Sequence, residues 1–157
     1  MEKDDDIANE AIEYFSGLFS GSMDSNPGEL VHLISTMVTR EENTRLEEVP
    51  DLEDVQRMVF TMDRESAASP DGFTGKFFTF AWDIIAQDMH RAVMSFFCGS
   101  DLPRFITSTS IVLIPKIPNP QDFSKFRPIS LCNFFNKLLS RILVECMASI
   151  LPRIISP

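Results

Sequence analysis

Most of the chain carries its apolar residues at helical spacing. Residues 7–19 bring theirs to one face, which predicts an amphipathic helix. Asn26 and Pro27 are typical of the start of a second helix, whose apolar stripe extends to Val38. The polar residues 39–50 predict a connector.

Further helices are predicted along the middle of the chain. Asp51 is placed to cap one of them. Ser69 and Pro70 favour another helix start, with Ser69 as the cap and Pro70 in the first turn. Residues 82–97 form the clearest amphipathic pattern in the sequence, and Gly99 is expected to end that helix.

The last apolar stretch, residues 133–151, has apolar residues that recur every four positions. Such a stripe moves about 40° around the helix at each step, because a helix has 3.6 residues per turn. The helix must therefore be covered on different sides along its length, which is typical of burial in a larger body. Pro152 is expected to end it.

Between the helices at 82–97 and 133–151 the pattern changes to two short apolar runs. The run from Ser110 to Ile114 is rich in β-branched residues and predicts a strand. The run from Phe126 to Leu131 predicts the return strand, and Pro128 restricts it to an edge or a strand start. The predicted fold class is therefore α+β, mostly helical, with one β-hairpin.

The formal charge differs between the two halves of the chain. The net charge is −9, but residues 1–65 carry 5 basic and 17 acidic residues, whereas residues 66–157 carry 9 basic and 6 acidic ones. The second half is therefore the better candidate to meet a phosphate backbone.

Cysteine spacing and hydropathy indicate the cellular setting. Cys98, Cys132 and Cys146 are widely spaced in apolar segments, which argues against a disulfide framework and favours a reducing compartment. The N-terminus has no apolar signal-peptide region, and no run of about 18 apolar residues is present to span a membrane. We expect a soluble intracellular protein of the cytoplasm or nucleus.

Three basic residues, interleaved with phenylalanines, surround the hairpin loop: Lys116, Lys125 and Arg127. Guanidinium and ammonium groups bind phosphate oxygens, so this cluster suits a phosphate ligand. Alternatively, the three residues keep an edge hairpin soluble. Lys137 and Arg141, one turn apart on the following helix, either extend the basic surface or form a solvated helix edge.

The sequence offers no catalytic constellation. It contains no Ser-His-Asp arrangement, Cys-His pair or glycine-rich phosphate loop. His32 and His90 lack partners at metal-ligand spacing and are interpreted as ordinary helix residues. No catalytic residue, metal ligand or cofactor is predicted for this chain.

Several short motifs occur along the second half of the chain in an order that is typical of one protein family. They are SerProAspGlyPheThrGlyLysPhePhe from residue 69, LeuProArg from 102, IleValLeuIleProLys from 111, PheSerLysPheArgProIleSerLeuCysAsn from 123 and IleLeuProArgIleIleSerPro from 150. Together they resemble the N-terminal part of the reverse transcriptase domain of LINE-type non-LTR retrotransposons, of the kind abundant in plants. The resemblance covers residues 66–157, and residues 1–65 look like the acidic helical linker that precedes the polymerase.

The resemblance implies a fingers subdomain fragment without the palm sheet. In the family, the lysine matched by Lys116 and the arginine matched by Arg127 reach the triphosphate of the incoming nucleotide. Lys125, Lys137 and Arg141 become candidates for contacts with the nucleic-acid backbone. Two positions depart from the family pattern: Ser69 stands in place of a glycine, and Cys146 stands where a basic residue is common.

The family's function is RNA-directed DNA synthesis on an RNA or DNA template–primer, with a deoxynucleoside triphosphate as substrate. It requires Mg²⁺ held by palm carboxylates, including an aromatic-x-Asp-Asp turn. This truncated chain lacks that turn and the palm and thumb segments, so we expect no polymerase activity from it. The alternatives are a nucleic-acid-binding remnant without chemistry, or a helical interaction module whose apolar final helix drives self-association.

Overall fold

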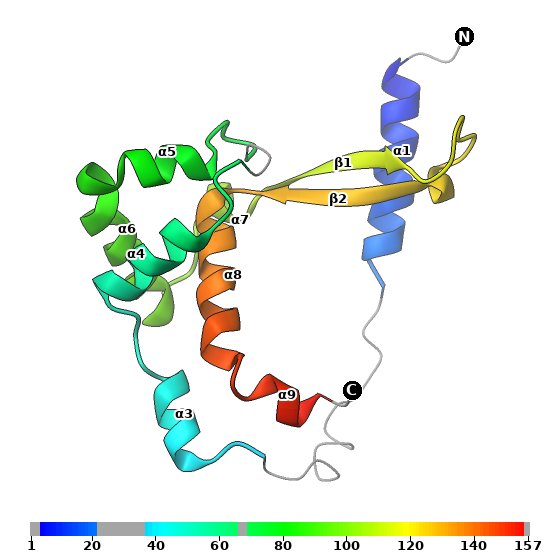
Figure 1. Cartoon of the computed structure of the whole chain (residues 1–157). Helices are drawn as coiled ribbons and strands as arrows, with labels where there is room; N and C mark the ends of the chain where they lie inside the picture. The colour runs from blue at the N-terminus through cyan, green and yellow to red at the C-terminus, as the bar shows by residue number, and fades with distance from the viewer. Residues whose placement is uncertain (1–3, 22–36, 66–68, 156–157) are drawn as a thin grey trace. The chain divides into compact units, whose positions relative to one another are not determined.

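The computed structural model of the chain describes residues 4–21, 37–65 and 69–155, in which helices dominate and two antiparallel strands form the sheet (Figure 1). These residues fall into two compact units. We call the first the hairpin unit; it is built from α1 (Asp4–Phe19) and residues Leu113–Ile129. We call the second the helical unit; it contains the described residues from 37 to 112 and from 130 to 155.

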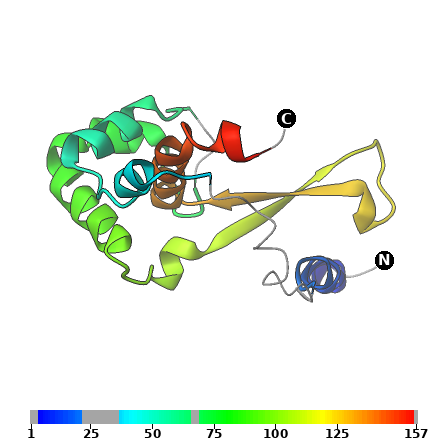
Figure 2. The ribbon, with the colours of Figure 1, turned by 90° about the horizontal axis from the view of Figure 1, so that it is seen from below.

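The core of the helical unit lies among α4 (Leu52–Thr61), α6 (Trp82–Phe97) and α8 (Phe134–Met147). Its fully buried side chains are Val55, Val59, Val93 and Leu138. In both ribbon views α4, α5 and α6 lie on one side of α8 (Figures 1 and 2). Because burying an aliphatic side chain contributes about 1.5–3 kcal/mol, this cluster supplies much of the stability of the unit.

An aromatic contact fastens α5 (Gly75–Phe80) to the beginning of α8. The rings of Phe78 and Phe134 stack with their centroids 4.0 Å apart and their planes 8° apart. The residues that follow the SerProAspGly motif therefore pack directly on the helix that follows the hairpin.

Several predicted elements are confirmed. The helix predicted over 7–19 is α1, which begins three residues earlier, at its three aspartates. The helix after Asp51 is α4, with Asp51 as its cap, and the helix over 82–97 is α6. Gly99 follows α6 with φ +90°, a conformation that favours glycine. The two predicted strands are β1 (Thr109–Pro115) and β2 (Phe126–Cys132).

The prediction of a connector over 39–50 is wrong, because α3 (Arg40–Leu46) lies within it. The helix starts with a capping box, in which the Thr39 hydroxyl accepts from the Glu42 N–H and the Glu42 carboxylate accepts from the Thr39 N–H. Arg153 of α9 (Leu151–Ile154) also donates to Glu42. Polar caps and a distant partner therefore stabilise a helix that has no apolar stripe.

The helix start predicted at Ser69 and Pro70 is also wrong. Residues 69–73 form a tight turn, in which the Gly72 N–H donates to the Ser69 carbonyl oxygen at 2.8 Å and the Ser69 N–H donates to the Phe73 carbonyl oxygen at 3.1 Å. Gly72 has φ +82°. The left-handed residue ends any helical continuation, so α5 begins only at Gly75.

The single helix predicted over 133–151 is divided in two. α8 ends at Met147, and Pro152 lies in the first turn of α9 rather than ending a helix. In α8 the buried side chains belong to the first nine residues, whereas Leu143, Val144 and Met147 are 36–49% exposed. At 100° per residue these buried side chains span about 140° around the helix, which is a single face, so the expectation that the helix is covered on different sides is wrong.

The helix predicted from Asn26 lies almost entirely outside the described residues. Its last two positions, Met37 and Val38, are described and are not helical. His32 also falls outside the described residues. His90 lies on α6, where its Nε2 is 3.2 Å from the carbonyl oxygen of Pro50, in keeping with an ordinary helix residue.

Candidate functional site

The register of the hairpin decides which side chains share a face. The Lys116 N–H donates to the Lys125 carbonyl oxygen at 2.8 Å, so these residues are opposite each other. Two residues back along β1 and two forward along β2, Ile114 then lies opposite Arg127. Opposite residues of an antiparallel pair share a face, as do alternate residues of one strand. Lys116 and Arg127 therefore lie on the same face of the hairpin.

Aromatic packing involves the opposite face. Phe126, the neighbour of Arg127, is half-buried, and its ring lies 6.4 Å from that of Phe123. Phe123 in turn contacts two rings of α1, with centroid distances of 5.8 Å to Tyr14 and 6.2 Å to Phe15. Because successive strand residues point to opposite faces, packing at Phe126 directs Arg127 to solvent.

The loop between the strands is shaped by one aspartate and one lysine. Asp122 caps the short 3₁₀ helix η1 (Phe123–Lys125), with its carboxylate accepting from the Ser124 N–H at 2.9 Å. The Ser124 hydroxyl also donates to this carboxylate and, as the largest cause, lowers the pKa of Asp122. The Lys116 Nζ donates to the Ser124 carbonyl oxygen at 2.9 Å. These contacts give the loop a defined conformation.

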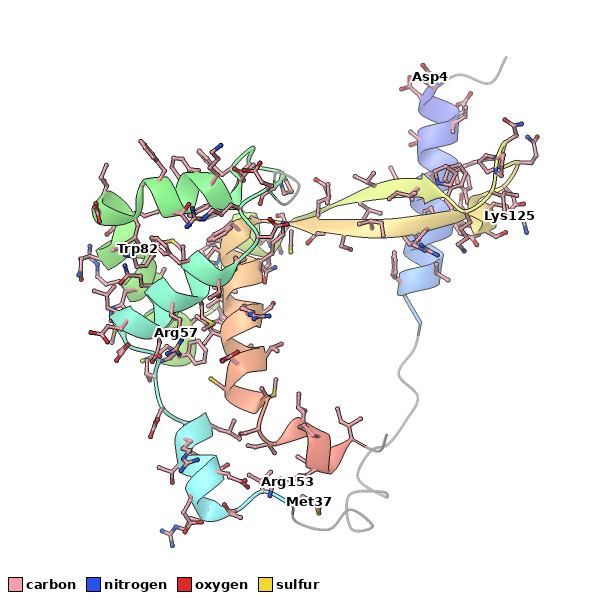
Figure 3. All side chains as sticks on the ribbon, in the orientation of Figure 1. Asp4, Met37, Arg57, Trp82, Lys125 and Arg153 are labelled. Atoms are coloured by element: carbon pink, nitrogen blue, oxygen red, sulfur yellow. The ribbon has the colours of Figure 1, made fainter. Side chains whose placement is uncertain are left out.

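The three cations of the hairpin, Lys116, Lys125 and Arg127, are exposed. In the described part of the chain none of them forms an ion pair with a carboxylate. The Asp122 carboxylate lies in the same loop, and the charge of Lys125 helps to lower its pKa, so it offsets part of the positive charge. The three cations still outnumber it, and this net positive charge favours an anionic ligand. Figure 3 labels Lys125 at the loop end of the hairpin.

The two other predicted basic residues, Lys137 and Arg141, belong to the helical unit. They lie one turn apart on α8; Lys137 is half-buried and Arg141 is exposed. Both therefore remain candidates for contacts with a nucleic-acid backbone. The structure joins Lys116, Lys125 and Arg127 into one site and leaves these two on a separate element.

Asn133 is a structural residue of this region that the sequence analysis missed. Its side chain caps α8 by accepting from the Asn136 N–H at 3.0 Å. Its amide donates to the carbonyl oxygens of Phe105 at 3.2 Å and Ile106 at 2.7 Å. This buried side chain thus ties the end of β2 to α7 (Arg104–Thr107). An asparagine directly before a helical apolar run is a signal that could have identified the cap.

The departure at Ser69 is accommodated by the turn. The described residues with positive φ are Asn119, Gly72 and Gly99, so position 69 does not need the freedom of glycine. Ser69 is buried, and its backbone closes the turn from both ends. The left-handed position of the SerProAspGly motif is Gly72.

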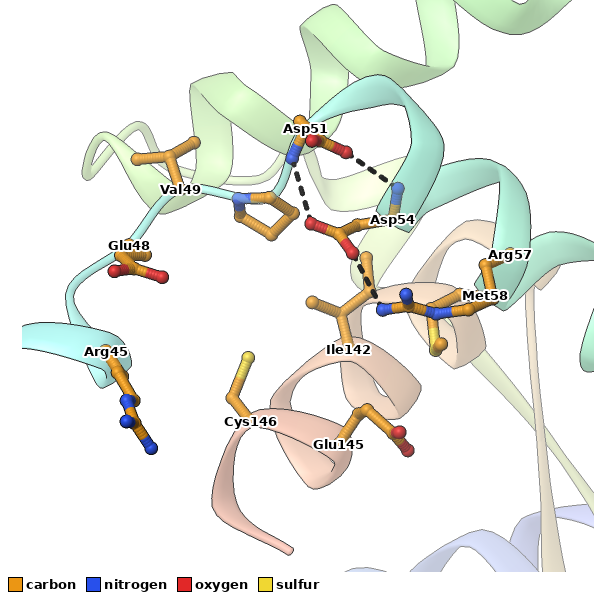
Figure 4. A pocket seen from close by; sticks show the side chains of 11 residues that line it. Arg45, Glu48, Val49, Asp51, Asp54, Arg57, Met58, Ile142, Glu145 and Cys146 are labelled. Atoms are coloured by element: carbon orange, nitrogen blue, oxygen red, sulfur yellow. Dashed lines mark hydrogen bonds and ion pairs between the residues drawn. The ribbon is translucent and has the colours of Figure 1, made fainter. Parts of the chain in front are cut away.

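A cavity of about 480 Å³ opens in the helical unit among α3, α4 and α8 (Figure 4). Cys146 lines it together with Met58, Ile142 and an ion pair. In that pair the Arg57 Nη2 lies 2.7 Å from the Asp54 Oδ1. Burial raises the pKa of the Cys146 thiol, and the charge of Asp54 raises it further. Cys146 is therefore an un-ionised thiol at neutral pH, in a cavity lined by both apolar and charged side chains.

Comparisons with known proteins give two relatives. A 149 kDa protein of the transposon TX1 of Xenopus laevis is 26% identical over 159 residues, which span all of this chain and 12% of the relative. The retrovirus-related Pol polyprotein of the type-1 retrotransposable element R2 of Bradysia coprophila is 32% identical over 87 residues, which span 52% of this chain and 10% of the relative. The chain is a retrotransposon-related protein.

The chain spans only about a tenth of the length of these relatives, and no family model matches it. In the described residues no helix is long and apolar enough to cross a membrane. The same residues hold no group of three or more His, Cys, Asp or Glu side chains with the geometry to bind a metal ion.

Proposed function

We propose that residues 66–157 of this retrotransposon-related chain are the fingers portion of a reverse transcriptase from a LINE-type non-LTR element of the kind abundant in plants. Residues 1–65 would be the acidic segment that precedes the polymerase. In this proposal the hairpin contacts the triphosphate of an incoming deoxynucleotide. The observation that carries it is the solvent-exposed hairpin face on which Lys116 and Arg127 lie together, opposite a face packed by aromatic rings.

The two cations have different chemistry for this task. Arg127 presents a planar fork of donors that can bind two phosphate oxygens at once. Lys116 has three ammonium donors, one of which is engaged by the Ser124 carbonyl oxygen, so two remain for a ligand. Arg127 is therefore the principal phosphate contact, and Lys116 adds a compact charge whose position the loop defines.

The chain alone is proposed to bind without turnover. The family reaction needs carboxylates that hold divalent metal ions, and the sequence contains no aromatic-x-Asp-Asp turn. The described donor set does not fit a metal site either, so no step of the reaction is assigned to residues of this chain. Magnesium-dependent primer extension by the purified 157-residue chain would contradict this part of the proposal.

The binding claim is tested by titrating the chain with dTTP in a metal-free buffer and comparing Arg127→Ala with the parent. A charged hydrogen-bonded contact contributes about 1.5–3 kcal/mol, so the variant should bind roughly ten- to hundredfold more weakly. Arg40→Ala is the matched control, because it removes another exposed arginine, from the start of α3. Equal affinity of all three proteins would overturn the proposal.

A nucleic-acid-binding remnant is the second candidate, and the exposed side chains of Lys125 and Arg141 favour it. Single-stranded DNA should then bind with an affinity that falls steeply with salt, because phosphate contacts release counterions. Lys125→Ala and Arg141→Ala should each reduce the salt slope. Binding that is negligible at low salt would reject this candidate.

An interaction module is the third candidate. Phe80 is 91% exposed and Ile84 is 85% exposed, and the second part of α8 is also uncovered in the described chain. Exposed apolar surface of this kind favours association with another protein surface, including a second copy of the chain. Sedimentation equilibrium that gives a monomer at all concentrations would count against self-association.

A further inference from the structure

The hairpin unit contains one further described element besides the hairpin itself, which is α1. Phe15 is the buried residue of that helix, with 6% of its surface exposed, whereas Ile12 and Leu18 are exposed by 65% and 59%. The ring of Phe15 lies 5.0 Å from that of Tyr14 and 6.2 Å from that of Phe123. The buried side of α1 is therefore the side that contacts the hairpin loop.

Phe123 is in turn built into the part of the loop that orients the cations. It lies between Asp122, which caps η1, and Ser124, whose carbonyl oxygen holds the Lys116 ammonium. Its ring also contacts Phe126, the residue before Arg127. Fixing the Phe123 ring therefore also limits the movement of Lys116, through Ser124, and of Arg127, through Phe126.

A two-stranded hairpin is at best marginally stable in water and gains order when it packs against a helix. In the hairpin unit that helix is α1. We propose that α1 is a positioning element of the phosphate-binding face: Tyr14 and Phe15 hold Phe123 so that Lys116 and Arg127 stay in the orientation that binds the triphosphate. The inference rests on the proposed function, and it gives the acidic N-terminal helix a role in the site.

The positioning role predicts an effect on affinity without any lost ligand contact. If release of α1 leaves the loop in its binding conformation only about a tenth of the time, the apparent affinity falls about tenfold. Phe15→Ala and Phe123→Ala should therefore weaken dTTP binding by about that factor. Phe123→Leu, which keeps an apolar side chain against α1, should recover most of the loss.

The experiment is a dTTP titration of the ¹⁵N-labelled full chain, combined with amide hydrogen exchange at Lys116 and Lys125. Ile12→Ala, an exposed change on the same helix, is the matched control and should alter neither measurement. Trp82 lies in the core of the helical unit, so an unchanged fluorescence spectrum shows that this unit remains folded in every variant. Faster exchange at the two lysine amides together with weaker binding, in Phe15→Ala and in Phe123→Ala, supports the proposal.

The outcomes separate this inference from the proposed function. If Arg127→Ala weakens dTTP binding but Phe15→Ala and Phe123→Ala do not, the positioning role is overturned and the function stands. If Arg127→Ala binds like the parent, the function fails, and with it the role of α1 in ligand binding. If the exchange rates of the Lys116 and Lys125 amides are unchanged in Phe15→Ala, α1 does not order the loop, and the inference is rejected whatever the affinities.

Discussion

The side chain of Lys116 donates a hydrogen bond to the carbonyl oxygen of Ser124, 2.9 Å away across the hairpin loop. The backbone of Lys116 donates to the neighbouring carbonyl oxygen of Lys125. One residue therefore closes the loop twice. The Arg127 side chain makes no comparable contact within the described residues, so Lys116 shapes the loop and Arg127 does not.

Lys116→Met should loosen the loop because it keeps the aliphatic stem and removes the donor. A hydrogen bond of this kind contributes about 0.5–1.5 kcal/mol, so amide exchange at Ser124 should accelerate by roughly two- to tenfold. Lys116→Arg, which retains a donor, should remain close to the parent. Hydrogen exchange followed by NMR measures the effect, and identical rates in Lys116→Met and the parent would show that the contact does not order the loop.

The contact between Glu42 and Arg153 should make the end of the chain sensitive to pH. The Arg153 hydrogen bond, together with that of the Thr39 N–H, holds the pKa of Glu42 below the ordinary value of 4.5. A lowered carboxyl pKa means that the contribution to stability is present above the unfolded-state value and is lost as the pH falls through the folded-state value. α9 should therefore detach from α3 only below about pH 4.5, and chemical shifts of Arg153 report it.

Arg153→Met is the matched variant for this prediction, because it keeps the stem and removes the charge. Amides of α9 should then have protection factors at pH 7 as low as those of the parent below about pH 4.5. Because both side chains are partly exposed, the effect should stay local and leave the core unchanged. An acid transition at α9 that persists unchanged in Arg153→Met would contradict this account.

Gly75→Ala tests the close approach at the start of α5. A Cβ atom at position 75 would lie 2.8 Å from the Asp63 carbonyl oxygen and 3.2 Å from the Arg64 Cα, which are backbone atoms. The backbone must shift, so we expect a loss of about 1–3 kcal/mol in the free energy of unfolding. Gly17→Ala is the control: nothing lies within 4 Å of its Cβ, and alanine should stabilise α1 by up to about 1 kcal/mol. Urea denaturation measures both; equal effects would refute the steric argument.

Local patterns were sufficient for the elements that have their own apolar stripe or β-branched run. α6 has the predicted bounds, and β1 and β2 extend the predicted strands by one residue or so at their ends. The cap at Asp51 also followed from residue type and position. In each case the pattern that predicts the element, whether an apolar stripe, a β-branched run or a cap, lies within a few neighbouring residues of the sequence.

The missed features depend on partners far away in the chain or on one backbone angle. α3 lacks an apolar stripe, and one of its stabilising contacts comes from Arg153. The helix start at Ser69 was prevented by the conformation of Gly72, which the SerProAspGly pattern fits as well as a helix start does. The contact of Phe123 with Tyr14 and Phe15 has no periodic signature, so the role of α1 at the hairpin could not be predicted from the sequence.

The three cysteines should differ in their reaction with iodoacetamide. Cys98 is exposed, whereas burial and the nearby Asp54 raise the pKa of Cys146 above the ordinary value of 9.0. Because the thiolate is the reacting species, Cys146 should be alkylated much more slowly than Cys98 at pH 7.5. Asp54→Asn should lower the pKa of Cys146 and reduce the difference in alkylation rate between Cys146 and Cys98. Mass spectrometry of peptides sampled over time gives the rates, and equal rates in the folded chain would contradict the structure.

The proposed function requires that the exposed hairpin face bind a triphosphate through Arg127 and Lys116. Its most direct measurement is the affinity of the full chain for dTTP, determined by NMR titration for the parent, Arg127→Ala, Arg127→Lys and the Arg40→Ala control. We expect chemical-shift changes confined mainly to the hairpin and an affinity that is roughly ten- to hundredfold weaker in Arg127→Ala. Arg127→Lys should lose less affinity, because it replaces the guanidinium fork by a point charge. The affinity of Arg40→Ala should equal that of the parent. Shifts located elsewhere, or equal affinities for Arg127→Ala and the parent, would contradict it.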